Sequence, residues 1–141
     1  MNAPNLKQAV PFFMVANMEK SLDFYVKGLG FELTMEWKPE GKIAWCWLEK
    51  EGVAVMLQEH SEANRPKDKP GVGFSVCFMC QDALALFDEF RKRNLTPAEP
   101  FVGNNLWVVS LRDPDGYHLA FESPTDVPEE TTYTDWIKKK S

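Results

Sequence analysis

Apolar and polar positions along the chain follow the same order twice. In each half, a short apolar run typical of a strand leads to a stripe of apolar side chains at helical spacing, and further strand-like runs follow. The expected strands of the first half are residues 9–15, 31–37, 42–49 and 53–59. Those of the second half are residues 72–80, 98–102, 106–112 and 117–123, of which 98–102 is the weakest. Asn17 and Asp82 are the expected N-caps of the two helices.

The two halves are related by a nearly constant offset in residue number. An offset of 65 joins Asn17 with Asp82, Leu22 with Phe87 and Tyr25 with Phe90, and an offset of 64 joins Gly52 with Gly116. We therefore predict a single α+β domain over residues 1–141, in which two tandem β-α-β-β-β modules form a curved mixed sheet around a trough. The modules are residues 8–59 and 72–123, with a linker at 60–71 and a C-terminal tail at 124–141. A trough between repeats is a natural place for a small-molecule ligand.

The composition narrows the classes of partner. The formal net charge is −5 and the pI is about 5.1, which argues against nucleic acid. The apolar runs are far shorter than the roughly 20 residues of a membrane-spanning helix, so no membrane partner is expected. The start of the chain lacks the basic-then-apolar order of a secretory signal, so the expected location is cytoplasmic. Cys77 and Cys80 form a C-x-x-C pair within an apolar run, where packing is favoured over zinc binding or redox chemistry.

Two segments carry a family resemblance. NMEKSLDFYVKGLGFEL at residues 17–33 and RDPDGYHLAFES at residues 112–123, taken with the repeat, resemble the vicinal-oxygen-chelate superfamily. This superfamily includes glyoxalase I, extradiol dioxygenases, and the fosfomycin- and bleomycin-resistance proteins. The resemblance spans roughly residues 8–123. It implies the β-α-β-β-β fold and a homodimer, because single-chain members with two modules usually pair and build sites from both chains.

The resemblance also indicates where a metal would bind. Metal-dependent members place ligands on the first strand of each module and on the last strand of one or both. Those positions are here Val10, Met56, Ser75 and Ala120. None of them is His, Glu or Asp, which a divalent metal needs as donors, so we expect no metal and no other cofactor. A shift of two residues in this alignment would instead bring His118 or Glu122 into the site.

Strand alternation predicts which side chains face the trough. The third strand could turn either Trp45 and Trp47 or Ala44 and Cys46 inward. The predicted ligand-binding residues are Phe12, Met14, Trp45, Trp47, Met56, Gln58, Ser75, Cys77, Trp107, His118 and Glu122. Aromatic faces and adaptable Met side chains are typical of sites for bulky aromatic or cationic guests.

Three functions fit these features. The first, favoured because the metal positions lack donors, is a metal-free protein that sequesters an aromatic or cationic small molecule such as an antibiotic, which resembles the bleomycin-resistance branch. The second is a divergent lyase, isomerase or dioxygenase with His118 and Glu122 as catalytic candidates, with a divalent metal or without one, or with Glu59 as the base. The third is a domain without a small ligand, whose trough is filled by its own side chains or by the tail with Tyr133 and Trp136.

Overall fold

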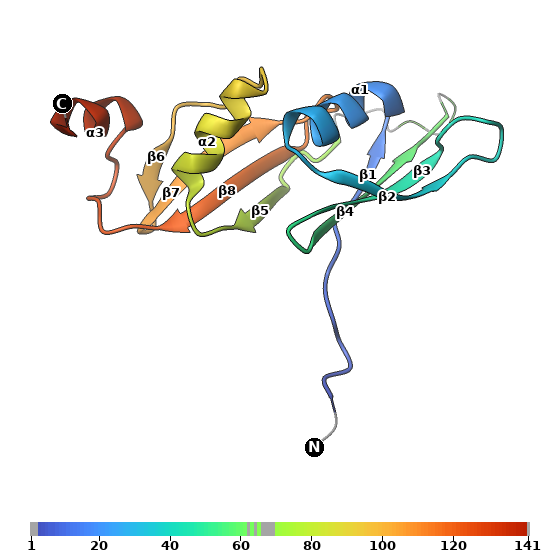
Figure 1. Cartoon of the computed structure of the whole chain (residues 1–141), viewed down its shortest axis with the longest axis horizontal. Helices are drawn as coiled ribbons and strands as arrows, with labels where there is room; N and C mark the ends of the chain where they lie inside the picture. The colour runs from blue at the N-terminus through green and yellow to red at the C-terminus, as the bar shows by residue number, and fades with distance from the viewer. Residues whose placement is uncertain (1–2, 62, 64, 66–69, 141) are drawn as a thin grey trace.

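The computed structural model of the chain describes residues 3–61, 63, 65 and 70–140 (Figure 1). The first module contains β1 (Phe12–Val15), α1 (Met18–Leu22), the π-helical segment η1 (Asp23–Gly28), β2 (Glu32–Trp37), β3 (Trp45–Lys50) and β4 (Val53–Glu59). The second contains β5 (Ser75–Met79), α2 (Ala83–Lys92), β6 (Phe101–Gly103), β7 (Leu106–Arg112) and β8 (His118–Pro124), and α3 (Tyr133–Lys140) follows. The predicted α+β fold with two β-α-β-β-β modules is confirmed. Residues 62, 64 and 66–69 of the predicted linker lie outside the described residues.

Each module forms its own four-stranded mixed sheet. The strand orders are β1-β4-β3-β2 and β5-β8-β7-β6, so the first strand of each module pairs with its last strand. That pairing is parallel, whereas the other strand pairs are antiparallel. The repeat in the sequence thus corresponds to one topology used twice.

Prolines shorten two of the expected strands. β1 begins at Phe12 rather than at residue 9 because Pro11 has no N–H to donate, although its carbonyl still accepts a hydrogen bond from the N–H of Met56 at 2.9 Å. β6 begins at Phe101, directly after Pro100, and is only three residues long.

The first two helices begin at the expected N-caps. The side-chain oxygen of Asn17 accepts a hydrogen bond from the N–H of Lys20 at 3.1 Å, and that of Asp82 accepts from the N–H of Ala85 at 3.0 Å. These helices lie on the same side of the sheets, so no helix of the described residues covers the opposite side (Figure 1). Among the described residues, no helix has the length and apolar character to cross a membrane.

One apolar core lies between the helices and the two sheets. Its largest fully buried side chains include Phe13, Tyr25, Leu29, Leu48, Leu57, Phe90 and Leu119. The core continues from one module to the other, because the rings of Phe31 and Phe78 meet edge to face with 6.3 Å between their centroids. The modules therefore do not pack as independent units.

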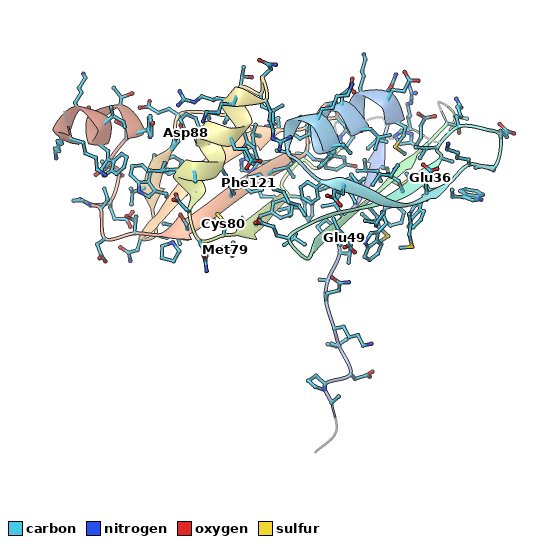
Figure 2. All side chains as sticks on the ribbon, in the orientation of Figure 1. Glu36, Glu49, Met79, Cys80, Asp88 and Phe121 are labelled. Atoms are coloured by element: carbon cyan, nitrogen blue, oxygen red, sulfur yellow. The ribbon has the colours of Figure 1, made fainter. Side chains whose placement is uncertain are left out.

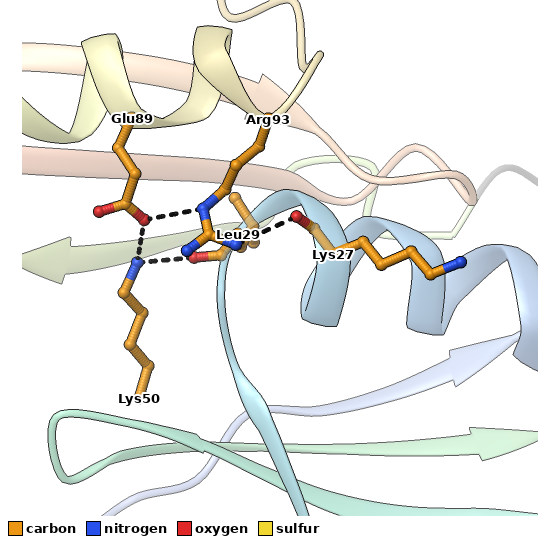
Figure 3. Close-up of polar contacts among 5 residues, drawn as sticks. All are labelled: Lys27, Leu29, Lys50, Glu89 and Arg93. Atoms are coloured by element: carbon orange, nitrogen blue, oxygen red, sulfur yellow. Dashed lines mark hydrogen bonds and ion pairs between the residues drawn. The ribbon is translucent and has the colours of Figure 1, made fainter.

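A largely buried lysine adds a polar joint between the modules (Figure 3). Lys50, at the end of β3, donates to the backbone carbonyl of Leu29 at 2.6 Å and to the Glu89 carboxylate of α2 at 2.7 Å. Arg93, the C-cap residue of α2, pairs with the same Glu89 oxygen at 3.3 Å and donates to the carbonyl of Lys27 at 3.3 Å. These contacts hold α2 against the end of η1.

The DPDG turn forms a second joint. The buried carboxylate of Asp113 accepts hydrogen bonds from the N–H groups of Asp115 and Tyr117 and from the hydroxyl of Tyr25 at 2.8 Å. Burial and the nearby charge of Asp113 raise the pKa of Tyr25 far above its usual value, so its hydroxyl remains a donor. Asp115 also accepts the N–H of Ala16 at 3.0 Å. The turn that is most recognisable in the sequence therefore connects the modules.

Candidate functional site

Aromatic and thioether side chains cover the helix-free face of the N-terminal sheet. Strand pairing aligns them in two rows that cross all the strands of this sheet. One row is Met35, Trp47, Met56 and Phe12, and the next is Trp37, Trp45, Gln58 and Met14. Phe12, Met35 and Trp37 are 48, 51 and 54% exposed, although large apolar side chains are usually buried. We call these two rows the aromatic face.

The structure decides which side chains of β3 lie on this face. Cys46 and Leu48 are fully buried on the helix side, so Trp45 and Trp47 point the other way. The indole N–H of Trp47 donates to the carboxylate of Glu49 at 2.8 Å, which orients the ring and places a negative charge beside it. Six predicted ligand-binding residues thus lie together, namely Phe12, Met14, Trp45, Trp47, Met56 and Gln58.

A β-bulge adds Met35 and Trp37 to the aromatic face, which the sequence analysis did not predict. In β2, Leu33 pairs with the buried Leu48 of β3, and Met35 pairs with the adjacent Trp47. Thr34 is therefore an extra residue in β2 without a pairing partner in β3. Strict alternation would place Leu33 on the same face as Met35 and Trp37. The hydroxyl of Thr34 donates to the carbonyl of Trp47 at 3.2 Å, but nothing in the alternation of the sequence marks this position.

The helix-free face of the C-terminal sheet carries smaller and more polar side chains in most of its rows. The rows, in order along β8, are Ser75, His118 and Arg112, then Cys77, Ala120 and Ser110, then Met79, Glu122, Val108 and Phe101. Met79 and Phe101, at the two ends of the third row, are 60 and 45% exposed. We call these three rows the polar face. Figure 2 shows Met79 of this sheet and Glu49 of the other sheet on the lower side of the ribbon, away from Asp88 of α2.

Trp107 belongs to neither face, so its prediction as a ligand-binding residue needs correction. It is 5% exposed and lies on the helix side of β7, where its ring contacts Trp136 of α3 with 5.5 Å between centroids. Tyr133 of the same helix packs edge to face on Phe87. Trp107 shares its face of β7 with the buried Val109 and Leu111, whereas the other face ends in the polar Ser110 and Arg112, so the alternation favours the helix side for Trp107. The tail therefore docks on the helix side of the protein and does not fill the helix-free faces.

The side chains do not fit the metal chemistry of the family resemblance. The side chains of Val10 and Ala120 have no atom that could bind a metal ion. Met56 has only a thioether sulfur, and Ser75 has one hydroxyl. Within residues 3–61, 63, 65 and 70–140, no group of three or more His, Cys, Asp and Glu could hold a metal ion.

His118 and Glu122, the catalytic candidates, do not converge on one point. They lie on the same face of β8, four residues apart, which corresponds to roughly 13 Å along a strand. Glu59, the alternative base, accepts the N–H of Met18 at 2.8 Å and thus supports the start of α1.

The cysteines of the C-x-x-C pair are free thiols. Cys77 is exposed on the polar face, while Cys80 is half-buried and donates to the carbonyl of Glu122 at 3.5 Å. Burial raises the pKa of both thiols, and the charge of Glu122 adds to this effect. A raised pKa keeps a thiol protonated, so neither cysteine has the character of an activated nucleophile.

Comparison with known proteins gives a family and a set of similar folds. A family model described as the Glyoxalase/Bleomycin resistance protein/Dioxygenase superfamily matches residues 7–121. No curated protein sequence matches the chain significantly.

Several solved structures have the same fold. TnmS3, an antibiotic binding protein from Streptomyces sp. CB03234, is 19% identical with a TM-score of 0.65, and the match covers 84% of this chain and 98% of that one. TioX from Micromonospora sp. ML1 is 19% identical with a TM-score of 0.62, covering 83 and 99%. A glyoxalase/bleomycin resistance protein/dioxygenase from Nocardioides is 15% identical with a TM-score of 0.62, covering 89% of each chain. At these identities the similarity concerns the fold.

Proposed function

This chain belongs to the glyoxalase/bleomycin resistance protein/dioxygenase superfamily, and we propose that it is a metal-free protein that sequesters an aromatic or cationic small molecule. The observation that carries the proposal is the aromatic face. Phe12, Met35 and Trp37 are about half exposed there, beside Trp45 and Trp47. Large apolar side chains gathered on one open surface mark a place where a ligand or another chain binds.

The aromatic face suits a planar or positively charged ligand. A cation above an indole ring gains about 0.5 to 2 kcal/mol from the ring quadrupole, depending on how well water is excluded. Glu49, which accepts the indole N–H of Trp47 at 2.8 Å, adds a full negative charge beside such a ring. Met14, Met35 and Met56 can change rotamer to fit ligands of different shape. Planar cationic compounds should therefore bind better than neutral compounds of the same size.

Binding is favoured over a metal-dependent reaction because of the residues at the family's metal positions. A divalent metal needs several imidazole or carboxylate donors that converge, and Val10, Met56, Ser75 and Ala120 supply none. Without such donors the family's usual means of polarising a substrate oxygen is not available. Of these positions, Met56 lies on the aromatic face, and Ser75 and Ala120 lie on the polar face.

We further propose that two copies form a homodimer in which the aromatic face of one chain lies against the polar face of the other. Both faces of a single chain are open, and Met79 on the polar face is exposed like Met35 on the aromatic face. Residues 3–9 are also exposed, and they leave the protein on the helix-free side, where a second copy would lie (Figure 1). Closing the faces would turn two open surfaces into enclosed sites that exclude water.

TnmS3 is named an antibiotic binding protein, which guides the choice of compounds to test. The test is a titration of glycopeptide, mitomycin-like and other planar aromatic compounds into the protein, followed by tryptophan fluorescence. We expect a saturable change for at least one compound, and weaker binding in Trp47→Ala and Trp45→Ala. Lys92→Ala, on the opposite side of the molecule, is the control and should leave the affinity unchanged. The absence of a saturable change with every compound would contradict the drug-binding form of the proposal.

Light scattering tests the dimer separately. The expected mass is twice that of the 16.2 kDa chain. Replacement of the exposed Met35 by Glu should reduce the dimer fraction, because it would place a charge inside the closed interface. A monomer at micromolar concentration would contradict the dimer, but it would not affect the aromatic face of the single chain.

A further inference from the structure

A pocket with three polar side chains in its wall lies at the end of the polar face where β8 begins. Its volume is about 590 Å³, and it is lined by the loop residues 70–74 together with Ser75, Arg112, Gly116 and His118. Among the residues that the structure describes, none of those lining the pocket is a carboxylate, although the chain has a formal net charge of −5. The charged side chain among these described residues is the cationic Arg112.

Strand pairing aligns three polar side chains along this pocket. Ser75 on β5 pairs with His118 on β8, and His118 pairs with Arg112 on β7. Neighbouring strands are about 4.8 Å apart, so the hydroxyl and the guanidinium lie on either side of the imidazole. Nη1 of Arg112 donates to the carbonyl of Gly116 at 3.0 Å, which holds the guanidinium at the pocket. The guanidinium has further N–H donors for a ligand.

The Ser75 and His118 pair can direct a hydrogen-bond donor into the pocket in either charge state of the imidazole. The Ser75 Oγ and the His118 Nδ1 are 2.6 Å apart. When the ring is neutral with its hydrogen on Nε2, the hydroxyl donates to Nδ1 and the Nε2–H remains for a ligand. When the ring is protonated, Nδ1–H donates to Oγ, and the hydroxyl hydrogen can turn toward a ligand as well. Acceptor-only ligands therefore suit this pair.

The loop of residues 70–74, which forms the other wall of the pocket, packs where the two modules meet. Gly71 has a φ of +75°, and a Cβ there would lie 2.7 Å from the ring of Tyr117, so the loop can approach this ring only with glycine. The hydroxyl of Tyr117 in turn donates to the carbonyl of Met14 at 3.1 Å. The loop thus packs on a ring that is tied to the first module, which fixes the shape of the pocket.

We propose that Ser75, His118 and Arg112 form a binding subsite for a small oxyanion, the carboxylate or phosphate group of a ligand. The fork of N–H groups on a guanidinium matches the oxygen atoms of both anions, and the imidazole and hydroxyl supply donors beside it. The subsite lies on the polar face and does not depend on ligand binding by the aromatic face. A protein that binds no aromatic compound could still bind an oxyanion here.

The test uses sodium phosphate as the probe and NMR signals of the histidine rings as the readout, at fixed pH and ionic strength. The chain contains two histidines, so His118 reports on the subsite and His60 is an internal control. We expect saturable shifts of the His118 signals while those of His60 stay in place. Arg112→Gln should weaken binding by about tenfold or more, which corresponds to one charge-assisted contact. Arg112→Lys should lose less, because the charge remains.

Arg91→Gln is the matched control, since Arg91 is an exposed arginine that pairs with Asp88 on α2. It should leave phosphate binding unchanged. The inference is overturned if the His118 shifts do not saturate, or if Arg112→Gln binds phosphate as the parent chain does. Unchanged His60 signals and circular dichroism verify that each variant is folded.

Four probes distinguish the two sources of the oxyanion. Phosphate and acetate represent free anions, and phenyl phosphate and benzoate carry the same groups on an aromatic ring. Tighter binding of the aromatic pair supports a subsite for the acidic group of a larger ligand, and equal binding supports a site for a free anion. If His118 responds to phosphate while no aromatic compound changes the tryptophan fluorescence, the subsite stands and the proposed function fails.

Discussion

The two helix-free faces differ in character although their sheets share one topology. The difference is greatest in the middle row of each face, where Met56 matches Ala120, Phe12 matches Cys77 and Trp47 matches Ser110. At each of these positions the N-terminal sheet has the larger side chain. The helix-covered faces do not differ in this way, since both are apolar and join in one core. The fold thus constrains one face of each sheet, while the other face is free to specialise for binding.

The difference also makes the two faces complementary. Large side chains such as Trp47 on one face and small ones such as Ala120 on the other can fit together when two copies meet. The space left between them would have an aromatic wall from one chain and a polar wall from the other. A ligand with an aromatic body and a polar group fits that combination better than either face alone.

The largest expected effect is a loss of stability that distinguishes a tryptophan on the helix-covered side of the sheets from one on the helix-free side. Trp107→Ala should lower the free energy of unfolding by about 3 to 5 kcal/mol, because Trp107 is buried between β7 and α3. Trp47→Ala should cost about 1 kcal/mol or less, yet weaken ligand binding by about tenfold or more, because Trp47 lies on the open face. Urea denaturation followed by circular dichroism measures the first effect, and the ligand titration measures the second.

These paired variants can also break the comparison. If Trp47→Ala destabilised the chain as much as Trp107→Ala, the aromatic face would be packed surface instead of binding surface. A ligand that bound equally well to both variants would likewise show that the aromatic face is not its site.

The contrast between these tryptophans shows what could be predicted from the sequence. Asn17 and Asp82 were placed correctly because capping depends on local sequence, and the constant offset between them identified the repeat. Trp107 was assigned to the trough because it is a tryptophan in a strand that could flank it, although Ser110 and Arg112 mark the other face of β7 as the more polar one. Trp37 was missed because the bulge at Thr34 breaks the alternation of β2. Local signals therefore sufficed for the elements, whereas the site required tertiary contacts.

The second prediction concerns the joint that fixes the two faces relative to each other. Asp113→Ala should lower the free energy of unfolding by about 3 kcal/mol, because it leaves three donors, from Tyr25, Asp115 and Tyr117, without their acceptor. Tyr25→Phe, which removes one of these donors, should cost about 1 kcal/mol. Denaturant unfolding measures both variants.

Asp126→Ala is the control for this joint, since Asp126 is exposed. It should change stability by less than about 0.5 kcal/mol. An equal effect of Asp113→Ala and Asp126→Ala would mean that the DPDG turn does not hold the modules together, and the orientation of the faces would need another explanation.

The third prediction concerns the Lys50 joint, where a smaller loss is expected. Lys50→Ala should cost about 1 to 2 kcal/mol, because the carbonyl of Leu29 and the carboxylate of Glu89 both lose a charged donor. Glu89 is partly exposed, so water compensates for part of this loss. Lys27→Ala, which breaks an exposed pair with Asp23, is the matched control and should cost about 0.5 kcal/mol or less. Equal effects of the two variants in thermal unfolding would show that Lys50 contributes no more than a surface charge.

The smallest expected effect is the pH dependence of the contribution of Asp113 to stability. It tests whether burial or the hydrogen bonds dominate the pKa of this carboxyl group. Burial raises the pKa of Asp113 above the usual 3.8, against the hydrogen bonds from Tyr117 and Tyr25, which favour the charged form. A carboxyl with a raised pKa binds its proton more tightly in the folded state. Its contribution to stability therefore falls as pH rises from 3.8 through the raised pKa, and it is constant above that range.

The amide of Asp113→Asn does not titrate in this pH range, so this variant is the reference for the carboxyl group of Asp113. On acidification from neutral pH, the difference in free energy of unfolding should shift in favour of the parent chain relative to Asp113→Asn. Urea denaturation of both proteins at several pH values measures this difference and cancels the contribution of the other carboxyl groups. A shift in favour of Asp113→Asn would mean that the hydrogen bonds outweigh burial and lower the pKa. The faces would then be held in place by a charged acceptor, and the joint would weaken in acid.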